Sequence, residues 1–198
     1  MQKSIGLFFG SFNPIHNGHT GLAQYLLQKG GFDEVWLVVS PNNPLKSKSD
    51  LWSEQLRIRL AKLATRDIKG LRVSDIETTL PLPSYTINTL NALSLKYPDY
   101  KFTLLMGSDN MALFDKWKQW EDILGNYPIM VYPRQGDDLE SLKKKYPQMQ
   151  VADGAPLILV SSTQIRKMLQ NGEDISDYVA ASVAAELQKK KNNYDRRF

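Results

Sequence analysis

The stretch "SIGLFFGSFNPIHNGH" at residues 4–19 contains the pattern that decides the fold. An apolar run at residues 4–9 is followed by a loop with glycines and then, from about residue 17, by a segment of helical periodicity. This succession is typical of parallel sheets whose strands are joined by crossover helices. Both histidines of the chain, His16 and His19, lie in this loop at the start of the helix. The loop is a candidate functional site, because ligands of such sheets bind beyond the carboxyl ends of the strands.

The same alternation continues along the rest of the sequence. Further strand-like runs are found at residues 34–39, 71–74, 101–106, 128–132 and 156–160. Helical periodicity is found at residues 20–30, 53–65, 86–97, 110–124, 139–146, 162–172 and 175–191. These patterns predict an α/β fold: a Rossmann-like open parallel sheet flanked by helices, with a small C-terminal helical part. We expect a single domain over residues 1–198, with helices at about 162–191 packed on it and a tail at 192–198.

The composition is typical of a soluble globular protein, with 42% hydrophobic and 23% charged residues. The chain has no cysteine, which excludes disulfides and thiolate metal sites. It has neither a secretory signal pattern nor a run of about 18 apolar residues, so we expect a cytoplasmic protein with no membrane partner. The net charge of +4 suits an anionic ligand, but it does not indicate a nucleic-acid partner, and none is expected.

Several well-known motifs are absent. The sequence contains no G-x-x-x-x-G-K-[ST], and no G-x-G-x-x-G follows a strand, which disfavours P-loop phosphotransferases and ordinary dinucleotide-binding dehydrogenases. The absence of G-x-S-x-G and H-E-x-x-H removes the support for common hydrolases.

The loop after the first strand has the properties of a phosphate-binding site. Gly10 and Gly18 allow the backbone to approach a ligand closely, and the helix that follows offers unpaired N–H groups to an anion. His16 and His19 can project toward the same side, and near a polyphosphate their protonated form would be favoured. The alternative is a turn whose histidines only cap the helix or pack. Finding both histidines at one helix start favours the functional interpretation.

A second candidate anion site lies near the other end of the chain. In "SSTQIRK" at residues 161–167, Ser161 and Gln164 have the spacing of a helix capping box. The hydroxyls of Ser162 and Thr163 and the guanidinium of Arg166 could bind phosphate oxygens beside the helix N–H groups. A simple helix cap remains the alternative here.

Other loops carry weaker signals. Lys46 follows the second strand but could be an ordinary solvated lysine, and Asp109 could bind ribose or cap a helix. Trp117 could stack on a heteroaromatic ring or belong to the core.

Taken together, these segments resemble a known family. "GSFNPIHNGH" resembles the H-x-G-H signature of the nucleotidyltransferase superfamily, and "SSTQIR" resembles its C-terminal S-S-T-x-I-R signature. "SYTINTL" (84–90), "MGSDN" (106–110) with "KWKQWEDI" (116–123), and "YPRQG" (132–136) match in order the pattern of bacterial nicotinate-nucleotide adenylyltransferases. The resemblance extends from about residue 4 to residue 170. The chain departs from the pattern at Phe9 and Asn13, where a second glycine and an aspartate are common, and at Leu45, where a histidine is typical.

The resemblance implies that ATP and nicotinate mononucleotide form deamido-NAD and pyrophosphate in NAD biosynthesis, with Mg²⁺ held by phosphates rather than directly by the protein. It implies a catalytic role for His16, His19 and Arg166. It implies ATP binding by Gly10, Ser11, Phe12, Asn13, His16, His19, Lys46, Gly107, Asp109, Arg134, Ser162, Thr163 and Arg166. It implies binding of nicotinate mononucleotide by Asn13, Ser84, Tyr85, Thr86, Asp109 and Trp117.

Three alternatives stay open. A related transferase could act on nicotinamide mononucleotide or phosphopantetheine, and a non-catalytic nucleotide sensor could keep the same binding loops. A metal hydrolase built on the two histidines is weaker, because the chain offers no third nitrogen or sulfur ligand. The sequence is compatible with a homo-oligomer but does not indicate one.

Overall fold

The computed structural model describes residues 2–41 and 51–194. Its strands are β1 (Lys3–Gly10), β2 (Glu34–Val39), β3 (Leu71–Ser74), β4 (Tyr100–Gly107), β5 (Ile129–Tyr132) and β6 (Gln150–Val151). Its α-helices are α1 (Asn17–Gly30), α2 (Glu54–Thr65), α3 (Thr86–Lys96), α4 (Ser108–Ala112), α5 (Trp120–Asn126), α6 (Leu139–Lys145), α7 (Ser162–Gln170) and α8 (Ala181–Tyr194). Two 3-10 helices, η2 (Ile76–Thr79) and η3 (Phe114–Lys116), precede α3 and α5.

The described strands form one parallel sheet in the order β3-β2-β1-β4-β5-β6. This arrangement confirms the predicted Rossmann-like open sheet. The chain begins in the middle of the sheet, moves outward to β3, and then returns to the other side of β1 as β4. Strand order therefore reverses between β1 and β4, and the loops after these two strands flank the crevice where such sheets bind ligands.

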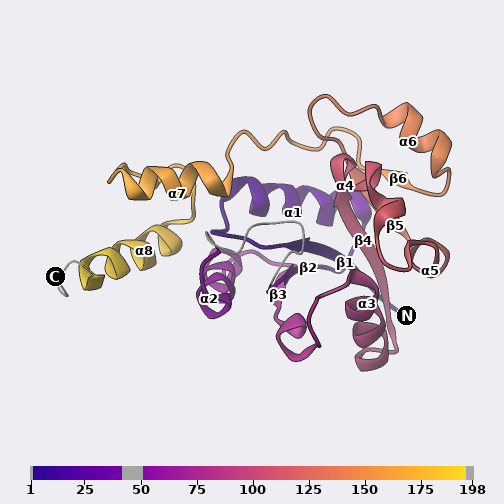
Figure 1. Ribbon diagram of the computed structural model, residues 1–198, viewed down its shortest axis with the longest axis horizontal. Helices are drawn as coiled ribbons and strands as arrows, with labels where there is room; N and C mark the ends of the chain where they lie inside the picture. The colour runs from indigo at the N-terminus through magenta and orange to yellow at the C-terminus, as the bar shows by residue number, and fades with distance from the viewer. Residues whose placement is uncertain (1, 42–50, 195–198) are drawn as a thin grey trace.

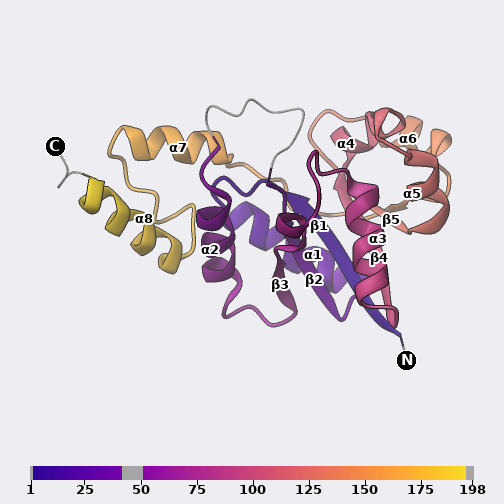
Figure 2. The same cartoon turned by 60° about the horizontal axis from the view of Figure 1, so that its bottom comes forward.

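Alternating side chains of the strands belong to two cores, one on each face of the sheet. On β1, Leu7 belongs to one core and Phe8 to the other. The core that contains Phe8 also holds apolar residues of α1, α2, α7 and α8, whereas the core that contains Leu7 holds residues of α3, α4, α5 and α6. Figures 1 and 2 show α7 and α8 at one end of the molecule and α4 to α6 at the other. Because helices cover both faces of the sheet, the sequences of the strands are nearly continuous runs of apolar residues.

The predicted strand at residues 156–160 is wrong. The sixth strand is β6, which pairs with β5, and residues 155–160 belong to no strand. Ile158 and Val160 pack against the core, whereas Leu157 and Leu159 are 57% and 89% exposed. The segment has the side-chain alternation of a strand, but it runs over the surface toward α7 without a neighbouring strand.

Two predicted helices have different limits. The segment at 110–124 is divided into α4, η3 and α5, and Gln119, in the left-handed region at φ 53°, marks the start of α5. The last helix begins at Ala181 rather than at residue 175, and the preceding turn places Ile175 and Val179 in the core. None of the helices in the described ranges is both long and apolar enough to cross a membrane.

Candidate active site

Glycines end the two strands at which the order reverses. Phe8 of β1 is paired with Leu105 of β4, so Gly10 and Gly107 end neighbouring strands. A Cβ atom on Gly10 would lie 2.8 Å from the Phe12 ring, and one on Gly107 would collide with the Asp109 carboxylate. A side chain at Gly10 would therefore displace the buried Phe12 ring, whereas one at Gly107 would require the Asp109 carboxylate to move.

Phe12 forms the turn between β1 and α1. Its backbone lies in the left-handed region at φ 43°, which is uncommon for a bulky residue, and its side chain is only 2% exposed. The ring packs edge-on against Phe8 and against His19, with centroid distances of 5.8 and 5.1 Å. Tertiary packing stabilises this conformation. A ligand could therefore contact Phe12 through its backbone, while the ring packs against His19.

His16 and His19 stack on each other at the start of α1. Their ring centroids are 3.6 Å apart, and the planes are inclined by 28°. The backbone N–H of His16 donates to Nδ1 of His19 at 3.3 Å. A neutral His19 therefore carries its proton on Nε2, because Nδ1 acts as the acceptor. The predicted convergence of the two rings is present in the structure.

His16 lies in an environment that disfavours a charged imidazole in the unliganded protein. The residue is only 3% exposed, and its Nδ1 atom is buried without a hydrogen-bond partner among the described residues. Burial, followed by the positive charge of Arg134, lowers the pKa of His16 to about 4. The His16 ring is thus neutral near pH 7 in the unliganded protein.

Helix α7 brings the second motif to the first. The Ser161 hydroxyl accepts a hydrogen bond from the backbone N–H of Gln164 at 3.1 Å, which confirms the predicted cap. The Ser162 hydroxyl donates to the Pro14 carbonyl at 2.9 Å. These contacts place the start of α7 against the loop that contains the histidines.

Arg166 makes the second link between the two motifs. Its Nη1 atom donates to the Asn13 carbonyl at 2.9 Å, and its Nη2 atom donates to the Thr163 hydroxyl at 3.4 Å. The Oδ1 atom of Asn13, a residue that is 6% exposed, accepts from the backbone N–H of Trp52 at 3.1 Å. Asn13 therefore joins three segments of the chain. Sequence reasoning did not identify Trp52, which carries no motif.

Asp109 and Arg134 lie beyond the ends of β4 and β5. Arg134 Nε is 3.8 Å from Asp109 Oδ1, and the guanidinium lies over the Tyr132 ring at 5.3 Å. The backbone N–H of Arg134 donates to Ser108 Oγ at 2.7 Å, and this buried hydroxyl donates in turn to Asp137. The two loops are thus joined at the same edge of the sheet as the histidines. Neither Ser108 nor Asp137 was identified from the sequence.

The predicted acceptor residues lie at the start of α3. Tyr85 is the N-cap and Thr86 the first helical residue, while the hydroxyl of Ser84 is buried and has no hydrogen-bond partner in the described part of the chain. Trp117 is half-buried, and its ring packs 5.5 Å from that of Phe114. Tyr85, Trp117 and Phe9 all pack against the same core. The three predicted residues and Trp117 are therefore on the side of the sheet that faces α3 to α6.

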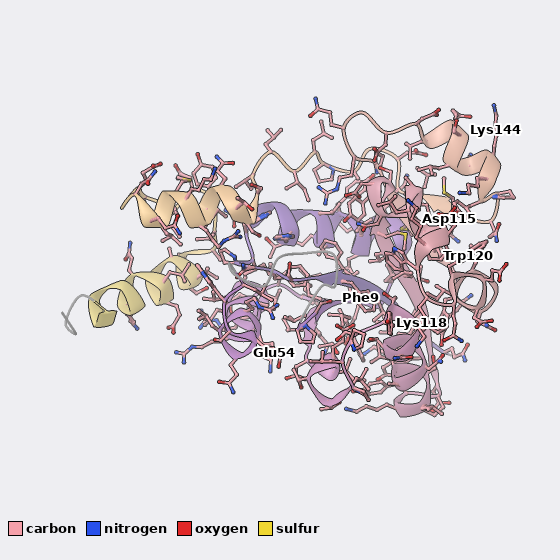
Figure 3. The ribbon with its side chains drawn as sticks, in the orientation of Figure 1. Phe9, Glu54, Asp115, Lys118, Trp120 and Lys144 are labelled. Carbon is pink, nitrogen blue, oxygen red and sulfur yellow. The ribbon has the colours of Figure 1, made fainter. Side chains whose placement is uncertain are left out.

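Lys118 is a charged neighbour of this region that the sequence did not single out (Figure 3). Its Nζ atom lies 4.4 Å from the centroid of the Tyr85 ring. Lys46, by contrast, is outside the described residues, so its predicted role is not tested by geometry.

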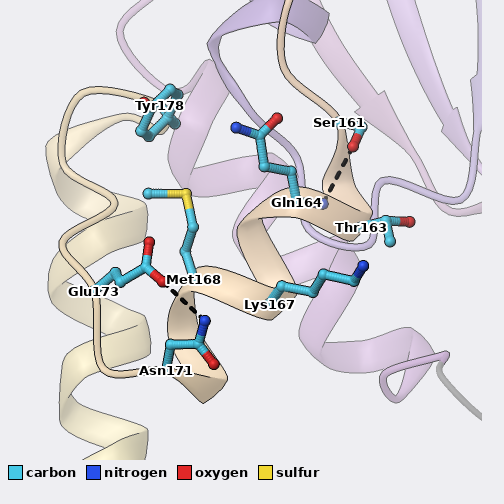
Figure 4. A pocket seen from close by; sticks show the side chains of 8 residues that line it. All are labelled: Ser161, Thr163, Gln164, Lys167, Met168, Asn171, Glu173 and Tyr178. Carbon is cyan, nitrogen blue, oxygen red and sulfur yellow. Dashed lines mark hydrogen bonds between the residues drawn. The ribbon is translucent and has the colours of Figure 1, made fainter.

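A cavity of about 440 Å³ lies on the outer side of α7. It is lined by residues of that helix and of the turn before α8, and Figure 4 shows Lys167 and Glu173 on opposite parts of its wall. Thr163 is its only lining residue from the predicted ATP site. The histidine loop does not line it. In residues 2–41 and 51–194 no group of three or more histidine, aspartate or glutamate side chains could hold a metal ion.

Comparisons with known proteins agree with this arrangement. A model of the cytidylyltransferase-like family matches residues 7–168. A Bacteroides fragilis protein described as "Probable nicotinate-nucleotide adenylyltransferase" is 44% identical over 194 residues, 98% of this chain and 96% of its own length. A Flavobacterium johnsoniae protein with the same description is 44% identical over 180 residues, which cover 90% and 93% of the two chains.

Solved structures share the fold. The Plasmodium falciparum nicotinic acid mononucleotide adenylyltransferase complexed with NaAD has a TM-score of 0.78 at 23% identity, with 98% of each chain covered. The family match spans both signature motifs, and the full-length relatives exceed 40% identity. The chain therefore belongs to the cytidylyltransferase-like family and groups within it with relatives described as nicotinate-nucleotide adenylyltransferases.

Proposed function

We propose that this protein transfers the adenylyl group of ATP to nicotinate mononucleotide and releases pyrophosphate, as a single-domain enzyme of NAD biosynthesis. The observation that carries the proposal is that the start of α7 is joined to the loop before α1, beyond the carboxyl end of β1. Ser162 and Arg166 of α7 donate to the backbone of the loop that leads to His16 and His19. Relatives at 44% identity with the corresponding description support the choice of substrates.

The reaction joins two anions and needs no protein nucleophile. A 5′-phosphate oxygen of the mononucleotide forms a bond to the α-phosphorus of ATP, while the bond from that phosphorus to the α,β-bridging oxygen breaks. The electron pair of the broken bond leaves with pyrophosphate. The protein's task is to align the two phosphates and to stabilise the charge that develops on the leaving group.

The histidine loop and α7 supply the groups for this task. The N–H groups at the starts of α1 and α7, the His19 ring and the Arg166 guanidinium would donate to the phosphate oxygens. A neutral His16 can also donate an N–H. Bound polyphosphate would raise its pKa and favour uptake of a proton, because a nearby negative charge stabilises the imidazolium.

ATP would contact Gly10, Ser11, the backbone of Phe12, Asn13, Lys46 and Thr163 near the phosphates, and Gly107, Asp109 and Arg134 on the nucleoside side. Mg²⁺ would be held by the phosphate oxygens rather than by a protein cluster, and it supplies neutralisation of their charge when bound. The acceptor would use Asn13 and Asp109 together with the segment at the start of α3. The N–H groups near Ser84, Tyr85 and Thr86 suit a carboxylate, and Trp117 offers a face for the pyridine ring.

The decisive experiment follows pyrophosphate release from ATP and Mg²⁺ with three separate acceptors: nicotinate mononucleotide, nicotinamide mononucleotide and phosphopantetheine. We expect release with the nicotinate compound at a kcat/KM that exceeds the others. Preference for the amide or for phosphopantetheine would overturn the substrate assignment. Tight ATP binding without release for any acceptor would support a nucleotide sensor and refute the enzyme.

A further inference from the structure

The largest fully buried side chain of the described residues is charged. Arg57, in the first turn of α2, has an exposed fraction of 0%. No carboxylate in the described chain forms an ion pair with it. Burial lowers the pKa of its guanidinium, and the negative charge of Glu54 opposes this shift only in part. Taking a cation out of water costs several kcal/mol, and an apolar side chain of similar volume would fill the same space without this cost. Packing alone therefore does not explain an arginine at this position.

The guanidinium instead donates hydrogen bonds to four backbone carbonyl groups in three segments. Nη1 donates to Ser11 at 2.7 Å and to Ser40 at 2.8 Å, and Nη2 donates to Pro41 at 3.0 Å. Nε donates to Trp52 at 3.0 Å. These carbonyls belong to the loop after β1, the residues after β2 and the residues before α2. A planar fork of N–H groups can satisfy acceptors in several fixed directions at once, which an ammonium cannot do with the same geometry.

Two of these bonds lead directly to the candidate active site. Ser11 immediately precedes Phe12, whose backbone has a φ of 43° and whose ring packs on His19. The backbone of Trp52 is engaged on both sides, because its carbonyl accepts from Arg57 and its N–H donates to Asn13. Asn13 in turn accepts from Arg166 through its carbonyl. Arg57 is therefore connected to His19 through Ser11 and Phe12. It is connected to Arg166 through Trp52 and Asn13.

We propose that Arg57 is a positioning residue for the phosphate-binding loop: it holds the Ser11 and Trp52 carbonyls so that His19 and Arg166 face the same phosphates. It touches no substrate. This inference rests on the proposed function for its kinetic consequences, but not for its structural ones, because the orientation of His19 can be observed without turnover.

The test compares Arg57→Lys with Arg59→Lys. Both residues lie on α2, but the Arg59 side chain is 65% exposed and forms an ion pair with Glu186 of α8. We expect Arg57→Lys to lower kcat/KM for ATP by roughly 10- to 100-fold, the scale of a small misplacement of reacting groups. The loss should combine a lower kcat with a higher KM for ATP. Arg59→Lys should match the wild type.

A spectroscopic measurement separates positioning from general destabilisation. The chain has only two histidines, so their imidazole ¹⁵N resonances can be assigned by single substitutions. We expect Arg57→Lys to shift the His19 Nδ1 resonance, which reports the bond from the His16 backbone, and Arg59→Lys to leave it unchanged. If the lysine variant does not fold, Arg57→Gln takes its place, since its amide still donates hydrogen bonds without carrying a charge.

A folded Arg57 variant with wild-type histidine resonances and wild-type ATP kinetics would overturn the proposal. If Arg57→Lys shifts the His19 resonance while the wild type adenylylates none of the acceptors, Arg57 is a positioning residue but the proposed function is refuted. The two failures are therefore distinguishable.

Discussion

The two helix starts that form the candidate site are held in place in different ways. At the start of α1, His16 is 3% exposed and stacks on His19, and the turn before it is packed into the core. At the start of α7, Ser161, Thr163 and Gln164 are exposed, and the helix is joined to the loop by the hydrogen bonds of Ser162 and Arg166. Burial sets the charge of the first site, whereas the position of the second depends on individual bonds. Substitutions at the start of α1 should therefore alter the rate of adenylyl transfer. Substitutions at the start of α7 should alter how firmly this helix is held against the histidine loop.

The largest effect is expected at His19. We predict that His19→Ala lowers kcat/KM for adenylyl transfer by roughly 10²- to 10³-fold, the usual loss when one donor to a developing negative charge is removed. The fold should persist, because the ring is only partly buried. Steady-state kinetics with ATP and nicotinate mononucleotide, together with a thermal unfolding curve, measure both quantities.

Gln24 provides a matched control for this change. It is exposed on the same helix, and Gln24→Ala should leave kcat/KM within about twofold of the wild type. Near-normal turnover by a folded His19→Ala variant would contradict the role of His19 in charge stabilisation.

The next effect concerns the pH dependence of stability. An unfolded chain takes up a proton at His16 near pH 6.5, but the folded protein does so only near pH 4. Above pH 6.5 the ring is neutral in both states, so the group adds no pH dependence there. As the pH falls from 6.5 to 4, the unfolded state binds the proton first, and the folded state loses roughly 3 kcal/mol from this group, at about 1.4 kcal/mol for each pKa unit.

Chemical denaturation at pH 7 and pH 4.5 measures this loss. We expect the free energy of unfolding of the wild type to fall between these values by about 2 kcal/mol more than that of His16→Gln, which cannot titrate. Equal falls in both proteins would show that His16 has an ordinary pKa and that the difference between the two helix starts is not electrostatic.

The fold could be predicted almost completely from local patterns. Buried parallel strands are apolar on both faces, so β1 to β5 were visible as short runs between helices. The failure at 156–160 has a physical cause: Ile158 and Val160 contact the core, so the segment has the composition of a strand, but hydrogen-bond partners depend on neighbours that no local pattern reveals. The two residues of β6 are too few to give a signal.

The site was predictable only in part, for a similar reason. His16, His19, Ser162 and Arg166 lie in motifs after strands, and the structure brings them together. The low pKa of His16 arises from burial and from Arg134, a residue 118 positions later, and is invisible to sequence spacing. Arg57 offered one usable signal. It shares the buried face of α2 with Leu60, Ala61 and Ala64, where a charged residue requires an explanation.

The smallest predicted effect tests the connection at α7. Ser162→Ala removes the bond to the Pro14 carbonyl, which should lower the free energy of unfolding by about 1 kcal/mol, the usual net value of such a bond. Because the bond joins α7 to the histidine loop, the KM for ATP should also rise a few-fold.

Ser161→Ala is the comparison, since it removes the helix cap at a similar cost of about 1 kcal/mol without touching the loop. If the two variants are equally destabilised and only Ser162→Ala changes the KM for ATP, the nucleotide site depends on the Ser162 hydroxyl and not on the helix cap. If both leave the KM unchanged, the nucleotide site does not depend on this bond, and the Arg166 bond and the packing of Ile165 are sufficient to hold α7 against the loop.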